Sequence, residues 1–588
     1  MMRLPQGGSD LDRTQALSFS YDGAALSGFA GDTLASALLG NGVRIVGRSF
    51  KYHRPRGVIS AGIEEPSAIL DLRHGSRHDP NARATIEPLA EGMRLSSVHA
   101  IGTAARDRLA VIDRFARFIP SAFYYKTFLW PRWMLFEPRI RAMAGLGRLD
   151  PEGRSVSEGT RHATVDVCVV GSGPAGLAAA LSAAGTGSKV MLVELGLRLG
   201  GSLLHRSAEV DGKPGADWAG DAGRRLKAAG VAVLTRAMAF GLYDHNSLAV
   251  VERGLPATQG SNGERLWHVR ARRIVLATGA IERPLLFGHN DLPGVMLADS
   301  ALMYLRRYAV RAGSRAVVAT GNDSAYETAI ALRQAGAEVV VVDSRNASPA
   351  LEHARAAGIE VRTGAKVETA LGSRGVEGVR ITDGTTITAD LLAVSGGWSP
   401  ALHLYCQAQG RPRWSDDRSA LVPGYGVLYE SEAAYNDATR PRHALEDLIP
   451  DGRAFIASVP QLVARLEKRL RTRLDYSRAS LRRLDALVAS YRSTHADSPT
   501  IDATLFQELT AYYGETLRRA LNAEWQATEE RVGKTQFIQL EPNLRFTAPG
   551  ALRSQLLKPW SSILNALYEE TNRSGSVTQA FDAESANR

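Results

Sequence analysis

The residues with the clearest chemical signature form a glycine-rich turn, Gly171-Ser172-Gly173-Pro174-Ala175-Gly176. The apolar run 165–170 precedes it and a run of small residues follows, so the pattern predicts a strand, a tight turn and a helix. The first glycine permits the sharp turn, the second lets the backbone approach a pyrophosphate, and the third lets the helix pack against the strand. Because the helix start also offers unpaired N–H groups to phosphates, the motif predicts a dinucleotide site.

An acidic residue follows at the position where the ribose of such a dinucleotide would lie. Glu194 ends the next apolar run, 190–193, at the spacing from the glycine turn that the motif requires. Its carboxylate would accept hydrogen bonds from the ribose hydroxyls and repel a 2′-phosphate, which favours NAD or FAD over NADP.

A second strand–helix–strand pattern occurs further along the chain. Its strands are expected at 316–319 and 338–342 and its helix at 324–334. The turn between them lacks the second and third glycines, and Asp323 would repel a pyrophosphate. Asp343 ends the second strand as a ribose-binding acid would. Two readings stay open, a second nucleotide site and a scaffold, and the turn favours the scaffold.

The elements around these units are less regular. We expect a strand at 17–21 and a helix opening at Asp32 and Thr33, with Asp32 as the N-cap, which together indicate a small α+β domain. Residues 101–149 are rich in aromatic side chains. They are expected to form a connector packed between domains, with a membrane-surface or aromatic ligand site as the alternative.

The tail has its own pattern. We expect long charged helices from about 459, the first with a leucine every fourth residue on an otherwise basic surface, then a helix at 505–521, a strand-like run at 537–540 and a disordered end from Gly575. The leucine face is expected to pack on a core, with an anionic partner as the alternative for the basic side.

Composition excludes several classes. The chain has 588 residues, a formal net charge of +10 and two cysteines. Cys168 and Cys406 are too few for a disulfide framework or for a cluster held by four thiolates. No apolar run is long enough to cross a membrane, and the opening residues do not form a signal peptide. We therefore expect a cytoplasmic protein with neither nucleic acid nor membrane as its partner.

Five motifs together resemble, in the same order, the α subunit of heterotetrameric sarcosine oxidase. They are GFAGDTLASALLGNGVRIVGRSFKYHRPRG, FYYKTFLWPR, the GSGPAG turn with GGSLL at 200–204, YDHN at 243–246, and LATGAIERPLLF. The resemblance covers about residues 15–423. The basic residues of the first motif are a candidate anion or subunit contact, with a solvated face as the alternative: Arg48, Lys51, His53, Arg54 and Arg56.

The resemblance implies an α/β fold. A Rossmann-like FAD/NAD(P)-binding domain (161–280 and 385–423) would carry an inserted second βαβ nucleotide-binding-like domain (281–384). An N-terminal 2Fe-2S ferredoxin-like β-grasp domain without cluster cysteines (1–100) and an aromatic connector and linker (101–160) would precede it. From residue 424 the chain departs from the family: a small α+β C-terminal domain (424–588) stands in place of the family's nucleotide-capping segment and folate-binding domain. We therefore expect folate-linked formaldehyde capture to be lost, and the missing capping segment argues against tight nucleotide binding.

The resemblance also implies a site. NAD, or alternatively FAD, would lie on the glycine turn and Glu194, and a flavin-bearing β-like partner subunit would oxidise a small secondary amine such as sarcosine. Leu195 and Gly196 depart from the polar pair that commonly follows the ribose acid. No catalytic residue, metal ligand or iron–sulfur cluster is expected. The implied cofactor-binding residues are Gly171, Ser172, Gly173, Pro174, Ala175, Gly176, Glu194, Leu195, Gly196, Gly201, Ser202, Ala277, Thr278 and Gly279.

The sequence is compatible with three hypotheses for the function of this chain. The favoured one is an oxidoreductase subunit that works with the flavin-bearing partner. The second is a stand-alone FAD-dependent NAD(P)H oxidoreductase, against which the altered second turn argues. The third is a binding or scaffold protein in which the tail acts and the oxidoreductase body does not.

Overall fold

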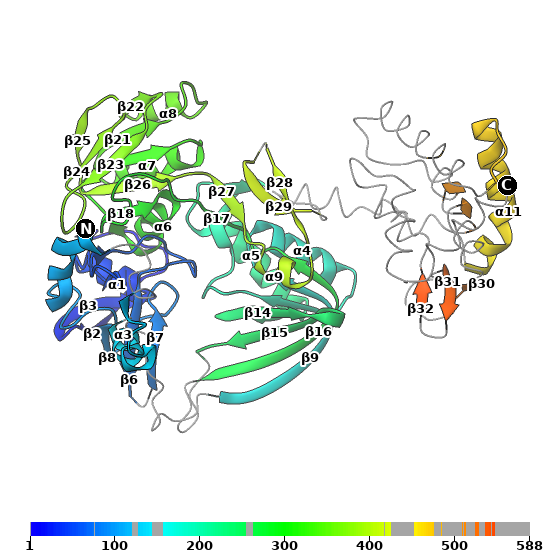
Figure 1. Ribbon diagram of the computed structural model, residues 1–588, viewed down its shortest axis with the longest axis horizontal. Coiled ribbons are helices and arrows are strands. Elements are labelled where there is room, and N and C mark those ends of the chain that lie inside the picture. Colours follow the sequence, from blue (N-terminus) through cyan, green and yellow to red (C-terminus); the bar gives the residue numbers. More distant parts are fainter. Residues whose placement is uncertain are drawn as a thin grey trace. The chain divides into compact units, whose positions relative to one another are not determined.

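A computed structural model describes most of the chain (Figure 1). The chain divides into two compact units, Met1–Asp437 and Ala438–Arg588. No helix among the described residues is both long enough and apolar enough to span a membrane. The described residues are 2–75, 77–119, 127–143, 157–254, 263–416, 418–424, 452–475, 484, 508–509, 511–512, 515, 524–527, 536–541 and 544–546.

An N-terminal domain is built on a five-stranded sheet of order β3-β2-β8-β6-β7. The predicted strand at 17–21 is longer than expected. The predicted N-cap is wrong, because Thr33 caps the helix in a reciprocal capping box with Ser36, whereas Asp32 pairs with Arg3 at 2.9 Å. The elements are β1 (Met2–Arg3), β2 (Asp12–Tyr21), β3 (Ala24–Ala30), α1 (Leu34–Gly40), β4 (Gly47–Arg48), β5 (Pro55–Arg56), β6 (Ile69–His74), β7 (Arg77–Arg83) and β8 (Met93–Ser97).

The connector follows as short helical segments: η1 (Arg108–Phe118), η2 (Trp133–Leu135) and α3 (Glu137–Met143). The expectation that its aromatic residues pack between domains is wrong for several of those described. Phe118 is 65% exposed and Trp130 is 84% exposed.

The first dinucleotide-binding unit has a six-stranded sheet of order β13-β10-β9-β16-β15-β14. β13, β10, β9 and β16 are parallel, and β15 and β14 continue antiparallel. α4 and α5 lie against the parallel part (Figure 1). The elements are β9 (Ser157–Val170), α4 (Pro174–Gly185), β10 (Val190–Val193), η3 (Gly201–Leu204), β11 (Glu209–Val210), β12 (Lys213–Pro214), α5 (Gly215–Ala228), β13 (Ala232–Leu234), β14 (Ala237–Tyr243), η4 (Asp244–Asn246), β15 (Ser247–Glu252) and β16 (Glu264–Leu276).

The second βαβ unit has a fully parallel sheet of order β18-β26-β20-β21-β22. The expected helix at 324–334 is confirmed, and the expected strands are slightly longer. A two-stranded link, β17 with β27, lies at the crossing between the units. The elements are β17 (Ala280–Glu282), β18 (Val295–Leu297), α6 (Ala298–Tyr308), β19 (Val310–Arg311), β20 (Arg315–Thr320), α7 (Ser324–Gln334), β21 (Glu338–Asp343), α8 (Leu351–Ala356), β22 (Glu360–Thr363), β23 (Val367–Leu371), β24 (Gly378–Ile381), β25 (Thr386–Thr388), β26 (Leu391–Ser395), β27 (Trp398–Pro400), α9 (His403–Gln407), β28 (Pro412–Ser415) and β29 (Ala420–Pro423).

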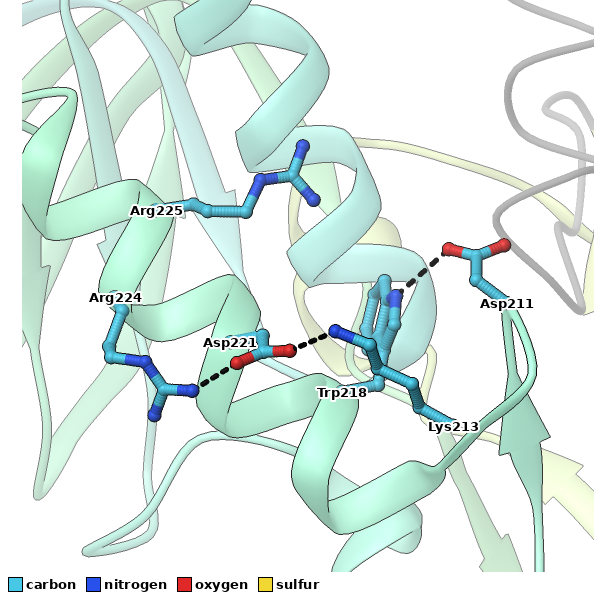
Figure 2. Close-up of a pocket in the computed structure, with 6 residues that line it drawn as sticks. All are labelled: Asp211, Lys213, Trp218, Asp221, Arg224 and Arg225. Carbon is cyan, nitrogen blue, oxygen red and sulfur yellow. Dashed lines mark hydrogen bonds and ion pairs between the residues drawn. The ribbon is translucent and has the colours of Figure 1, made fainter.

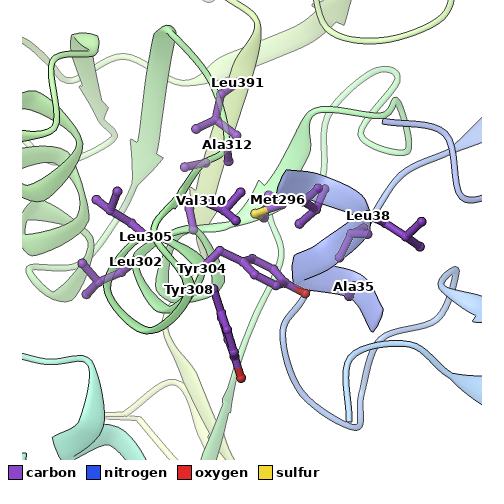
Figure 3. Packing of buried hydrophobic residues seen from close by; sticks show 14 of the residues in the cluster. Ala35, Leu38, Met296, Leu302, Tyr304, Leu305, Tyr308, Val310, Ala312 and Leu391 are labelled. Carbon is purple, nitrogen blue, oxygen red and sulfur yellow. The ribbon is translucent and has the colours of Figure 1, made fainter. Parts of the chain in front are cut away.

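The N-terminal domain shares its hydrophobic core with the second βαβ unit (Figure 3). Ala35 and Leu38 of α1 belong to one buried cluster with Met296 and Tyr304. The Tyr304 hydroxyl donates to the carbonyl of Ser60 at 3.0 Å, and β1 pairs with β19. These two parts therefore form one packed body.

The second compact unit contains α11 (Gly452–Leu470), β30 (Glu524–Ala527), β31 (Gln536–Glu541) and β32 (Leu544–Phe546). The basic helix expected from about 459 begins earlier, at Gly452, and Leu462 and Leu466 on its leucine face are buried. β31 contains the predicted run 537–540. Most of the helix expected at 505–521, and all of the end expected to be disordered, lie outside the described residues.

Candidate functional site

The three glycines of the turn after β9 have different surroundings. A Cβ on Gly171, where φ is +98°, would lie 2.2 Å from the carbonyl oxygen of Ala277, and one on Gly176 would lie 1.9 Å from the carbonyl oxygen of Gly171. Both positions need glycine for packing. A Cβ on Gly173 would meet nothing within 4 Å. The space beside Gly173 is therefore open to a ligand that approaches the backbone closely.

The start of α4 faces the same space. Gly173 is its N-cap and carries no side-chain cap, and Pro174 occupies the first helical position. The amides of Ala175 and Gly176 are therefore left without a capping side chain from this chain. A helix start of this kind favours an anion such as a pyrophosphate.

The expected ribose acid is held against the turn. One carboxylate oxygen of Glu194, Oε2, accepts from the Ser172 amide at 2.8 Å and from its hydroxyl at 2.5 Å. The other, Oε1, accepts from the Gly196 amide at 2.6 Å. Gly196 thus positions the acid through its backbone, whereas Leu195 makes no polar side-chain contact. A carboxylate has about four acceptor sites, so Glu194 retains capacity for ribose hydroxyls.

The remaining predicted residues meet at the same edge of the sheet. A Cβ on Gly201 would lie 2.9 Å from the Cα of Gly173, so the glycine pair abuts the turn. Ser202 is exposed beside it. After β16, Ala277 bonds back to β9, the Thr278 hydroxyl donates to the carbonyl of Ala401 at 2.9 Å, and the Ala401 amide donates to Gly279. All fourteen predicted positions lie on the turns and helix starts that follow β9, β10 and β16, the edge where doubly wound sheets bind ligands.

The corresponding groups in the second unit are satisfied internally. Asp343 is buried and its carboxylate accepts four hydrogen bonds, which fill its acceptor sites. They come from the Tyr326 hydroxyl at 2.8 Å, the Arg345 amide at 2.9 Å, and the Arg345 guanidinium at 3.1 and 2.8 Å. Arg345 also pairs with Asp323 at 2.7 Å. The hydrogen bond and charge of Asp343 raise the pKa of Arg345, and burial raises the pKa of Tyr326 to about 12. The acid that could have held a ribose is already bonded to its own unit.

Sequence reasoning missed a partly buried polar cluster between the first and second βαβ units. His205 Nε2 lies 3.1 Å from the carboxylate of Asp299, and Arg206 donates to the same carboxylate at 2.9 Å. The Arg206 guanidinium lies 4.7 Å from the centre of the Trp398 ring. His205 follows η3, and Asp299 lies in the first turn of α6. No sequence spacing indicates this contact, because the residues come from different units.

Glu282 of β17 adjoins this cluster. Its Oε2 accepts from the Asp299 amide at 2.8 Å, and its Oε1 is buried without a partner among the described residues. Burial raises the pKa of Glu282 to about 7; the charge of Asp299 adds to the shift, while the hydrogen bond from the Asp299 amide and the charge of Arg206 oppose it. Glu282 therefore changes charge near neutral pH inside the junction.

A hollow on the first dinucleotide-binding unit lies away from the predicted site. It has a volume of about 360 Å³ and lies at α5 and the β11–β12 hairpin (Figure 2). Lys213 and Arg224 in this hollow both contact Asp221, and the Trp218 indole donates to Asp211. The glycine turn does not line it.

Two protein-family models match this chain and define the class of protein to which its domains belong. Residues 14–100 match the 2Fe-2S iron-sulfur cluster binding domain, and residues 165–418 match the pyridine nucleotide-disulphide oxidoreductases. The chain thus combines a ferredoxin-type domain with a Rossmann-like FAD/NAD(P)-binding domain. Among solved structures, L-proline dehydrogenase from P. horikoshii matches with a TM-score of 0.49 and 21% identity, over 73% of this chain and 68% of that chain.

Individual relatives identify the family more narrowly than the domain models do. The sarcosine oxidase alpha subunit of Rhizobium meliloti (strain 1021) is 43% identical over 72% of this chain and 44% of its own length, and that of Corynebacterium sp. (strain U-96) is 37% identical over 71% and 41%. An opine oxidase subunit of Agrobacterium tumefaciens (strain Ach5) is 26% identical over 44% of this chain and 57% of its own length. The chain is a sarcosine oxidase alpha subunit homologue, and it spans less than half the length of those sarcosine oxidase subunits.

The residues of the ferredoxin-type domain do not fit a cluster held by four thiolates. Neither Cys168 nor Cys406 falls within residues 14–100. Within that stretch, the buried carboxylate of Glu65 instead accepts from four backbone amides, those of Ile59, Ser60, Ser67 and Ala68. Burial raises the pKa of Glu65, and the four amides oppose that rise.

Proposed function

We propose that this chain is an oxidoreductase subunit that binds one NAD in its first dinucleotide-binding unit. It acts in the cytoplasm with a flavin-bearing partner subunit, which oxidises a small secondary amine such as sarcosine. The observation that carries the proposal is the open space at Gly173, bounded by the uncapped start of α4 and by Glu194. The similarity to sarcosine oxidase alpha subunits supports the substrate class and the partner.

The chain's own residues would bind and orient the dinucleotide. NAD, when bound, supplies a ring that accepts or gives a hydride. The amides of Ala175 and Gly176 would hold the pyrophosphate, and Glu194 would hold the ribose and reject a 2′-phosphate. Leu195, Ser202, Thr278 and Gly279 would line the remaining length of the site.

FAD in the same site is the alternative, in a stand-alone NAD(P)H oxidoreductase. That reaction needs a second nucleotide site in the second βαβ unit. Asp343 there is buried and bonded to Tyr326 and Arg345, which disfavours this function.

The test is the absorbance spectrum of the purified chain, together with mass spectrometry of the nucleotide released on denaturation. Gly173→Ala would fill the open space, whereas Gly185→Ala, at the other end of α4, adds a methyl group that also meets nothing within 4 Å. We expect NAD without flavin from the natural chain and from Gly185→Ala, and none from Gly173→Ala. Bound FAD would support the stand-alone enzyme, and a chain that binds no nucleotide would contradict both functions.

A further inference from the structure

Exposed apolar side chains concentrate in one short part of the sequence. Of the fourteen large hydrophobic residues exposed among those described, eight lie between residues 101 and 135. A concentration of this kind marks an interaction surface more often than isolated exposed residues do. We call residues 101–119 and 127–143 the exposed connector. The eight residues are Ile101, Val111, Phe115, Phe118, Leu129, Trp130, Met134 and Leu135.

The apolar residues of η1 are exposed. Because η1 is a 3-10 helix with about three residues per turn, Phe115 and Phe118 lie on one face and Val111 lies about a third of a turn away. Val111, Phe115 and Phe118 are 49%, 55% and 65% exposed. Asp113 falls on another side and accepts from Arg54 of the N-terminal domain at 2.6 Å. One side is therefore anchored and the apolar side faces outward.

Polar contacts, among them a buried ion pair, attach the exposed connector to the N-terminal domain. His53 Nδ1 lies 2.6 Å from the carboxylate of Asp107, and both side chains are almost fully buried. Arg48 donates to the carbonyl of Ala104 at 2.7 Å, and the Tyr52 hydroxyl donates to that of Ile119 at 3.0 Å. The basic loop expected to be an anion or subunit contact thus holds the connector in place, which preserves the outward orientation of its apolar face.

Exposed arginines are interspersed with the apolar residues along the exposed connector. Exposed guanidinium groups without an ion pair to any described residue alternate with the apolar residues. Arg117 lies 4.7 Å from the centre of the Phe118 ring. Apolar side chains interspersed with unpaired cations fit a protein surface that is apolar and carries carboxylates. These arginines are Arg106, Arg108, Arg114, Arg117, Arg132 and Arg139.

We propose that the exposed connector is the docking surface for the flavin-bearing partner subunit, whose contacting face is apolar and carries Asp and Glu. The proposal rests on the proposed function. A second copy of this chain fits less well, because a two-fold contact would place these arginines against one another. The relatives' names, in which both sarcosine oxidase and opine oxidase chains are subunits, agree with a different polypeptide as the occupant.

Photo-crosslinking in the full-length chain tests the surface. A photoreactive residue replaces Phe115 or Trp130 in the tagged chain in its host cell, and Trp414, which is also exposed but lies on β28, is the control position. We expect positions 115 and 130 to crosslink to one flavin-bearing polypeptide and position 414 to leave it unlinked. Phe115→Glu with Phe118→Glu should reduce co-purification of that polypeptide at least about tenfold, whereas Leu421→Glu should not.

The remaining outcomes separate the two proposals. If a flavin-bearing polypeptide co-purifies with the natural chain but crosslinks elsewhere or not at all, the docking surface is wrong and the proposed function stands. If no such polypeptide co-purifies, the proposed function fails as well. Crosslinks from positions 115 and 130 to a second copy, to residues 438–588 or to lipid would overturn the proposed occupant.

Discussion

The two βαβ units of this chain share a strand–turn–helix–strand pattern that ends in an acidic residue, but the surroundings of the turn and of the acid differ between them. In the first, Gly173 leaves open space at the helix start, and Glu194 is tied to the turn itself. In the second, Asp343 is bonded to Tyr326 and Arg345. The same strand–helix–strand element therefore forms a ligand site only where the turn is open and the acid faces it.

The second unit has another role in the fold. Its helix α6 contributes Tyr304 and Tyr308 to the core that it shares with α1 of the N-terminal domain (Figure 3). Tyr304 is fully buried, and burial raises its pKa well above the ordinary value. The packing supports the scaffold reading of this unit. Substitutions in the two units should therefore have different consequences.

The largest effect is expected from Gly176→Ala in the first unit. The added methyl group would lie 1.9 Å from the carbonyl oxygen of Gly171, so strand and helix must separate. We expect the free energy of unfolding to fall by about 3 kcal/mol or more. Denaturant unfolding of the full chain measures this free energy, and Gly185→Ala is the control. Equal stability of the two variants would contradict the close packing of Gly176 against Gly171.

Asp343→Asn should damage the second unit without affecting the nucleotide. The change leaves Arg345 without its buried carboxylate and weakens the bond from Tyr326. We expect a loss of about 2–3 kcal/mol in the free energy of unfolding and an unchanged content of bound nucleotide. Tyr326→Phe, which keeps the charge pair, should cost less. A loss of nucleotide in Asp343→Asn without loss of stability would mean that the second unit binds it.

Glu282→Gln should alter how stability depends on pH at the junction of the units. The pKa of Glu282 is raised to about 7 from an ordinary value of 4.5, so the folded chain holds its proton where the unfolded chain has lost it. This contribution to stability is complete below about pH 4.5 and is lost as the pH rises through about 7. Between about pH 5 and 8 the natural chain should lose on the order of 1–3 kcal/mol relative to Glu282→Gln. Thermal unfolding at a series of pH values measures the stability of both chains. A difference in stability that does not change with pH would refute the raised pKa of Glu282.

Glu194→Gln is expected to have the smallest effect. The amide keeps the shape of the side chain but removes the charge and one acceptor, so NAD should bind about tenfold more weakly, a change of about 1.4 kcal/mol. Isothermal titration with NAD measures the affinity, and NADP serves as the comparison because the variant no longer repels a 2′-phosphate. An unchanged preference for NAD would show that Glu194 does not face the ribose.

Local patterns were sufficient to predict the two βαβ units. The boundaries of β10 and α7 follow from apolar runs and a small-residue turn, because these depend on neighbours in sequence. The contact of His205 with Asp299 could not be predicted, because it joins two units. Composition alone cannot distinguish a buried tryptophan from Trp130, which is exposed. The N-cap was misassigned because Asp32 and Thr33 are both good capping residues, and Arg3 decides between them by pairing with Asp32.

The most direct measurement is the number of nucleotides released per chain by the natural protein, Gly173→Ala and Asp343→Asn. We expect one NAD from the natural chain, none from Gly173→Ala and one from Asp343→Asn. Two nucleotides per chain, or one that survives Gly173→Ala and is lost in Asp343→Asn, would contradict the assignment of the site to the first unit.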